Sequence, residues 1–106
     1  MDFKVVGPAA VHDSHVADVT CAADRCVVTL NPVDGPAIEV EFEGVRLVTQ
    51  VDPIGMMLYS INQVLSESGS RTFIFVNWDD NDERRLEVSA DVARWRTVGQ
   101  ASWQTV

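Results

Sequence analysis

The chain has 106 residues, of which 46% are hydrophobic and 23% charged, and these fractions exclude an intrinsically disordered or fibrous protein. Sixteen acidic residues against eight basic ones give a formal net charge of −8, which repels nucleic-acid phosphates and anionic lipid headgroups. We therefore expect no nucleic-acid and no membrane partner, and one domain over residues 1–106, because this length suits a single hydrophobic core.

The sequence favours the cytoplasm as the compartment. Residues 1–11 lack the basic stretch and uninterrupted apolar run of a signal peptide. No apolar run approaches the roughly 20 residues that span a bilayer. Cys21 and Cys26 are too few for the disulfide framework of a small secreted protein.

The first predicted elements alternate apolar and polar residues, which is the pattern of strands with one face on the core. Turn formers at 23–24 and 31–36 separate them. The residues expected to face the core are Ala17, Val19 and Cys21 in the first strand, Cys26, Val28 and Leu30 in the second, and Ile38, Val40 and Phe42 in the third.

Gly44 marks a bulge or tight turn, after which Val45, Leu47 and Val51 are expected to continue the core-facing pattern. Residues 71–78 are apolar on both faces, which predicts a central strand. A last strand is predicted over residues 86–89, where Leu86 and Val88 alternate with polar residues. The structure of residues 91–106 is not predicted by their pattern.

Two structures compete for the segment near residues 53–66. Apolar residues at helical spacing follow an Asp-Pro pair, which predicts a short helix. Met57, Tyr59 and Ile61 also alternate, which predicts a strand that pairs with residues 71–78 through the Ser-Gly-Ser turn of residues 68–70. The predicted fold class is therefore mainly β, with a single antiparallel meander sheet or a partly open barrel, and α+β if the helix forms.

His12, His15, Cys21 and Cys26 are the densest set of potential metal ligands, since imidazole and thiolate suit zinc. The four residues between the cysteines do not fit a zinc knuckle. We favour buried core thiols on the two strands. A cross-strand disulfide and a metal site are the alternatives.

His12, Asp13 and Ser14 are residue types of hydrolase triads, but consecutive residues in an extended chain point in alternating directions. We expect Asp13 or Ser14 to cap a turn and His12 to hydrogen-bond the backbone. The acidic run 79–83 lacks the spacing of a calcium-binding loop, so we expect a solvated turn between strands.

Three tryptophans are the candidate partner-binding residues: Trp78, Trp95 and Trp103. Together with Tyr59, Phe73 and Phe75 they would form an aromatic binding patch, since tryptophan is enriched at interface hot spots. Core packing is the competing interpretation, although Trp95 and Trp103 occur in polar surroundings.

Four short segments carry a resemblance to known proteins, namely residues 12–14, 42–45, 73–78 and 86–90. The chain resembles small uncharacterised bacterial β-rich proteins, some of which are similar to immunity proteins of toxin systems. The resemblance implies one β-rich domain with no established activity.

The leading functional hypothesis is a non-enzymatic domain that binds another protein and needs no cofactor. One alternative is a small metal-binding protein or hydrolase-like enzyme that uses His12, His15, Cys21 or Cys26. The other is a structural homodimer, because an open sheet leaves unpaired backbone groups at its edges.

Overall fold

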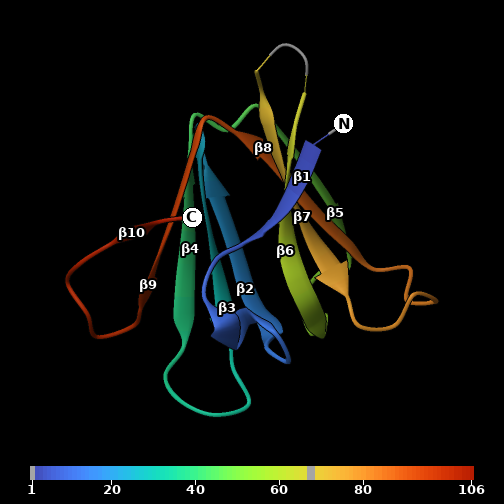
Figure 1. Cartoon of the computed structure of the whole chain (residues 1–106), viewed down its shortest axis with the longest axis vertical. Coiled ribbons are helices and arrows are strands. Elements are labelled where there is room, and N and C mark those ends of the chain that lie inside the picture. Colours follow the sequence, from blue (N-terminus) through green and yellow to red (C-terminus); the bar gives the residue numbers. More distant parts are fainter. Residues whose placement is uncertain (1, 67–68) are drawn as a thin grey trace.

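Two five-stranded antiparallel sheets form a β-sandwich in the computed structural model, which describes residues 2–66 and 69–106 (Figure 1). Sheet A contains, in spatial order, β1 (Asp2–Val6), β6 (Leu58–Leu65), β7 (Arg71–Asn77), β8 (Arg85–Ala90) and β5 (Leu47–Val51). Sheet B contains β10 (Gln104–Thr105), β9 (Val92–Thr97), β4 (Ile38–Glu43), β3 (Arg25–Asn31) and β2 (His15–Ala22). A single 3-10 turn, η1 (Ala9–Val11), leads from β1 towards β2.

The expected mainly β fold is confirmed, whereas the expected single sheet is wrong in that detail. The chain forms two consecutive meanders, β2–β3–β4 in sheet B and β6–β7–β8 in sheet A. Residues 58–65 form a strand, so the helix near 53–66 does not occur, and η1 is the one helical element of the described residues. The hairpin between β6 and β7 is the predicted one, but residues 67–68 of its turn lie outside the described part.

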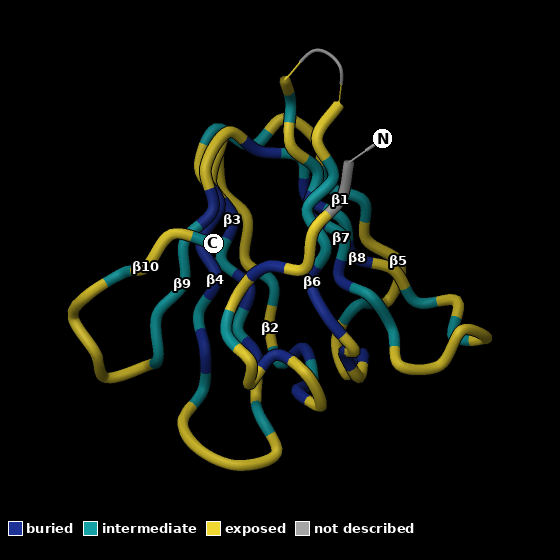
Figure 2. The backbone as a smooth tube through the Cα atoms, viewed as in Figure 1, coloured by how far each residue is buried: buried dark blue, intermediate teal, exposed yellow. Residues whose placement is uncertain are grey.

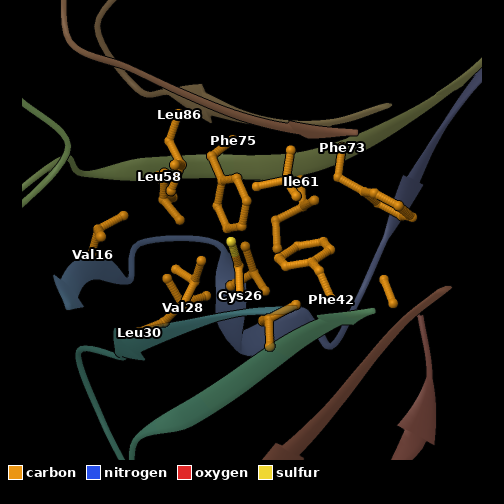
Figure 3. Close-up of a cluster of buried hydrophobic side chains, with 14 of the residues drawn as sticks. Val16, Cys26, Val28, Leu30, Phe42, Leu58, Ile61, Phe73, Phe75 and Leu86 are labelled. Atoms are coloured by element: carbon orange, nitrogen blue, oxygen red, sulfur yellow. The ribbon is translucent and has the colours of Figure 1, made fainter. Parts of the chain in front are cut away.

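The hydrophobic core lies between the sheets, as Figure 3 shows. Phe42 of sheet B packs against Phe73 and Phe75 of sheet A, with ring centroids 5.2 and 6.1 Å apart. Such tilted and edge-on ring pairs stabilise a core beyond the area they bury. Phe42 is fully buried, and β7 is the central strand of sheet A, as its apolar sequence predicts.

The chain passes between the sheets twice at the same place. Gly44 lies between β4 and β5 with a φ of 65°, and Asp91 lies between β8 and β9. The Asp91 amide donates to the carbonyl oxygens of Glu43 and Gly44 at 3.1 and 3.3 Å. A Cβ atom on Gly44 would clash with the Asp91 side chain, so this close approach requires glycine.

After the crossing at Gly44, the residues of β5 that face the core are not those that the alternating pattern predicts. Val48 packs against the core, whereas Leu47 and Val51 are 63% and 50% exposed. The prediction that Leu47 and Val51 face the core is therefore wrong. The chain changes sheets between Gly44 and Leu47, and the strand face that meets the core changes with it.

The other side of the sandwich is closed by backbone hydrogen bonds between the start of β2 and the chain before β6. The Val16 amide donates to Met56 O at 2.9 Å, and the Leu58 amide donates to Ser14 O at 2.8 Å. A register shift after Val16 leaves that residue in the core and Ala17 only half-buried, so Ala17 is not the core residue that alternation predicts.

Candidate interaction surface

The three tryptophans named by the sequence lie in three different environments. Trp95 packs against the core from β9. Trp103 lies under two guanidinium groups of its own chain, with Arg96 Cζ 4.4 Å and Arg94 Cζ 5.3 Å from the ring centroid. Trp78, directly after β7, is 46% exposed. The structure therefore does not gather these residues into one patch.

Trp78 instead belongs to a compact cluster with Tyr59 and His12, which we call the aromatic cluster. The ring centroids are 5.1 Å apart for His12 and Tyr59, 5.0 Å for His12 and Trp78, and 5.2 Å for Tyr59 and Trp78. Tyr59 is half exposed, and His12 is also exposed. The predicted patch thus holds only for Tyr59 and Trp78, because Phe73 and Phe75 are buried in the core.

Hydrogen bonds to backbone carbonyl groups connect the elements that carry the aromatic cluster. His12 follows η1, and its Nδ1 lies 3.0 Å from the Tyr59 carbonyl oxygen. The Trp78 amide donates to Met57 O at 3.0 Å, which extends the β6–β7 pairing by one step. A register shift in β6 between Leu58 and Ser60 leaves Leu58 buried while Tyr59 faces solvent. The three rings therefore lie at the hydrogen-bonded end of the β6–β7 hairpin.

Two hollows adjoin the aromatic cluster on either side of Tyr59. The first, of about 390 Å³, is lined by residues 5–9, Val11, His12, Tyr59 and Ser60, and we call it the β1 hollow. The second, of about 370 Å³, is lined by Tyr59, Val76, Asn77, Trp78 and Asp80, and we call it the β7 hollow. Apolar walls with a few polar groups are typical of sites that receive side chains.

The acidic run 79–83 forms the β7–β8 loop next to the β7 hollow, and most of it is exposed (Figure 2). This confirms the predicted turn between strands. Asp82 accepts hydrogen bonds from the Arg84 amide at 2.9 Å and from its side chain at 3.2 Å, and these bonds hold the pKa of Asp82 below its ordinary value. Asp79 Oδ1 accepts from the Asn81 amide at 2.9 Å.

The remaining acidic side chains of this loop are not neutralised by the chain itself. The carboxylates of Asp80 and Glu83 have no ion pair within residues 2–66 and 69–106. Arg84 is committed to Asp82, and Arg85 lies 3.4 Å from Glu87. Asp80 and Glu83 both line a third hollow of about 420 Å³, which shares Val76, Asn77 and Asp80 with the β7 hollow.

The outer face of sheet B is different because its charges pair with one another. Glu41 is 1% exposed and forms ion pairs with Arg25 and Arg94. Arg94 also pairs with Glu43 at 2.6 Å, and Arg96 pairs with Glu39 at 2.9 Å. Trp103 lies against Arg94 and Arg96. The charged groups of this face are therefore largely paired with one another, which makes them less available to a partner.

The four predicted metal ligands do not form a site together. Cys21 and Cys26 are direct cross-strand neighbours and form a disulfide, so they are not free thiols and the disulfide alternative holds. Cys26 is buried in the core as predicted, whereas Cys21 is exposed and does not face the core. Because disulfide sulfurs are not thiolates, they are poor metal ligands. His15 lies in β2, opposite Asn31 and Met57, while His12 belongs to the aromatic cluster. No group of three or more metal-binding side chains occurs in the described part of the chain.

His12, Asp13 and Ser14 shape the entry to β2, as the sequence suggests. The Ser14 hydroxyl is buried and donates to Val11 O at 2.6 Å. Asp13 has a φ of 69°, and its amide donates to Leu58 O at 3.0 Å. His12 Nε2 lies 3.9 Å from Asp13 Oδ1. The serine oxygen thus faces a backbone carbonyl rather than the imidazole, and it is not placed as a nucleophile.

Sequence reasoning missed His12 as a member of an aromatic surface. Its neighbours Asp13 and Ser14 suggested a turn, and the 47 residues that separate it from Tyr59 hide the contact. The available signal in the sequence was the position of Tyr59 and Trp78 at the two ends of the predicted hairpin.

Comparison of the chain with family models, curated proteins and solved structures finds no match. The resemblance to immunity proteins therefore stays a prediction. Among the described residues, no helix has the length and apolar character that crossing a membrane requires.

Proposed function

We propose that this protein is a binding domain for another protein, without catalytic activity, and that the aromatic cluster with its two hollows is the contact surface. The observation that carries the proposal is the placement of Tyr59 and Trp78, whose rings contact each other while the two residues are 50% and 46% exposed. Tyrosine and tryptophan, together with arginine, are enriched at interface hot spots. Large rings left in water also raise the free energy of the unbound protein, since burying them is favourable.

Two features of the surroundings support this surface over the others. The β1 and β7 hollows flank Tyr59 and give a partner side chain a place to insert. Buried anchors of this kind, surrounded by a polar rim, are the usual anatomy of an interface. Here the loop of residues 79–83 supplies that rim.

Site-specific photocrosslinking tests the proposal in the native host. A photoreactive phenylalanine analogue replaces Tyr59 in one variant, and in the matched control it replaces Thr20, which is exposed on β2 of sheet B. The proposal predicts one defined crosslinked protein from position 59 that is lost when Trp78→Ala is added. Equal crosslinking from position 20, or products from position 59 that persist in Trp78→Ala, would contradict it.

The resemblance to immunity proteins gives the proposal its biological setting, in which the partner is a toxin encoded beside this protein. The neighbouring genes in the source organism test this setting. A toxin gene that is found adjacent, and whose product crosslinks at position 59, supports it.

The cytoplasm, expected from the sequence, is the compartment that goes with this setting, but the Cys21–Cys26 disulfide favours an oxidising one. Disulfides persist in oxidising compartments and are rare in the cytosol. Thiol labelling of protein taken directly from the host distinguishes them: labelled cysteines support the cytoplasm, and blocked cysteines support an oxidising compartment.

A homodimer is a second candidate, favoured by the edge strand β5. Among the residues that the structure describes, β5 pairs only with β8, and its Leu47 and Val51 are exposed. Such edges template pairing with another strand. Light scattering during size-exclusion chromatography tests this: a dimer that dissociates in Leu47→Lys supports edge pairing, and a monomer at all concentrations refutes it.

A further inference from the structure

We infer that the aromatic cluster and the adjoining acidic loop receive a basic segment of the partner, with a lysine or arginine side chain seated in the β7 hollow. The inference rests on the proposed function and adds the chemistry of the partner. It depends on three observations: a Trp78 ring that no arginine or lysine of the described residues covers, carboxylates without an ion pair in the loop that follows it, and a hollow lined by Trp78 and Asp80.

Two partly exposed tryptophans of this protein differ in their contacts with cationic side chains. Trp103 lies against Arg96 and Arg94, whose guanidinium carbons are 4.4 and 5.3 Å from the ring centroid. No arginine or lysine of the described residues lies over Trp78 in this way, although its ring is 46% exposed. The face of an indole ring attracts cations. A cation of the partner would lie over the Trp78 ring as Arg96 lies over the Trp103 ring.

The charges around Trp78 favour such a cation and oppose an anion. Asp80 lines the β7 hollow together with Tyr59 and Trp78. Asp80 and Glu83 lack an ion pair within the described chain, while Arg84 and Arg85 are held by Asp82 and Glu87. The net charge of −8 adds a long-range field of the same sign. Such complementarity steers a basic partner and selects against acidic ones.

The β7 hollow also has the form that a long cationic side chain needs. Its volume of about 370 Å³ corresponds to roughly a dozen liquid water molecules, which leaves room for one extended side chain. Val76, Tyr59 and Trp78 offer apolar walls to the methylene groups, and Asp80 lies at the charged end. Lysine and arginine side chains bury their stems against apolar walls in this way.

Defined peptides test the inference directly. The probe is a nine-residue peptide of alternating arginine and serine, and its control replaces each arginine by citrulline, which keeps the shape but removes the charge. Binding is followed by nitrogen–proton correlation spectra of the labelled protein. We expect the arginine peptide to shift the Trp78 indole signal and the amides of residues 76–83. We also expect binding to weaken as salt increases, since exposed charges are screened.

Matched variants localise the effect. Asp80→Asn combined with Glu83→Gln should weaken binding about tenfold, because it removes two of the three loop carboxylates that have no ion pair in the described chain. Asp18→Asn removes a carboxylate that is also exposed but lies on β2 of sheet B, and it should leave the affinity within about twofold, since distant surface charges are screened. Trp78→Leu should also weaken binding, and its spectrum shows at once whether the fold persists. The carboxylate variants test the inference even if Trp78→Leu unfolds.

Equal affinity of the citrulline peptide, equal loss in Asp18→Asn, or no shift at millimolar peptide would overturn the inference. The proposed function is judged separately by crosslinking. If position 59 captures a partner through a neutral or acidic segment, the proposed function stands and the basic-segment inference fails. If position 59 captures no partner while the arginine peptide binds at residues 76–83, the cation site stands and the protein-binding function fails.

Discussion

Replacement of Glu41 by alanine should destabilise this protein more than any other single charge removal on sheet B. Glu41 lies in the middle of β4, between β3 and β9, and only 1% of its side chain is exposed. One carboxylate oxygen pairs with Arg25, and the other accepts from Arg94 Nε at 2.8 Å. The carboxylate therefore joins three neighbouring strands.

The size of the stability loss depends on how far Arg25 and Arg94 are exposed to water. Removing one member of a fully buried ion pair costs about 3–5 kcal/mol, because an uncompensated charge remains in the interior. Here the side chains of Arg25 and Arg94 are 58% and 38% exposed, so water can solvate both guanidiniums after the substitution. We therefore expect a loss of about 2 kcal/mol in the free energy of unfolding for Glu41→Ala.

Urea denaturation measures this loss as a shift of the midpoint by about 1 M at an unchanged slope. The matched control is Glu43→Ala, which removes an exposed carboxylate that also pairs with Arg94, at 2.6 Å, and should cost less than about 0.5 kcal/mol. Glu41→Leu fills the same space without charge and should lie within about 1 kcal/mol of the parent protein. Equal effects of Glu41→Ala and Glu43→Ala would refute the reasoning.

Three further predictions concern the core, the disulfide and the acidic loop. Phe42→Ala should lower the free energy of unfolding by about 3–5 kcal/mol in urea denaturation, because it opens a cavity between the sheets beside Phe73; a loss under about 1 kcal/mol would contradict the sandwich core. Reduction of the disulfide, whose cysteines are 5 positions apart, should cost about 2 kcal/mol by loop-closure entropy, measured as the difference between midpoints with and without reductant, and no difference would contradict it. Asp82 has a pKa below its ordinary value of 3.8, so the stability it contributes is present above that pH and is lost as the pH falls through its folded value. Asp82→Asn should thus be less stable than the parent protein at neutral pH and converge with it in acid, and parallel stability–pH curves would exclude this role.

Much of the fold was predictable because the strands with one face in water carry plain alternation. Ile38, Val40 and Phe42 are all buried as predicted, and so are Leu86 and Val88. Alternation alone does not say which sheet a strand joins, so the division into two sheets was not predictable. It depends on the crossings at Gly44 and Asp91, where contacts between distant residues decide the path.

The segment before and within β6 was ambiguous because a register shift mimics helical spacing. Leu58 and Ile61 are both buried and lie three positions apart, as on one face of a helix. Both belong to strand β6, and the register shift between Leu58 and Ser60 interrupts the strict alternation that a regular strand would show. Met56 is fully buried but fits neither the helical spacing nor the alternating pattern. It lies where the chain before β6 is hydrogen-bonded to the start of β2. Tertiary contact, not propensity, decides this region.

The candidate surface was predictable only in part. Exposed aromatic residues were expected, but the sequence weighted Trp95 and Trp103 because their neighbours are polar. Those polar neighbours include Arg94 and Arg96, and both arginines lie against the Trp103 ring. Intramolecular pairing of a tryptophan with a cation is invisible in a local pattern, as is the assembly of His12 with Tyr59 and Trp78.

The central claim is that Trp78 and its cluster, rather than Trp103, contact the partner. Calorimetric titration of the crosslinked partner into Trp78→Ala and Trp103→Ala tests it most directly, with both variants first shown to be folded. Truncation of a hot-spot residue costs about 2 kcal/mol or more, so we expect the Kd of Trp78→Ala to rise by about thirtyfold, while that of Trp103→Ala stays within about twofold. An unchanged Kd for Trp78→Ala, or a larger rise for Trp103→Ala, would contradict the account.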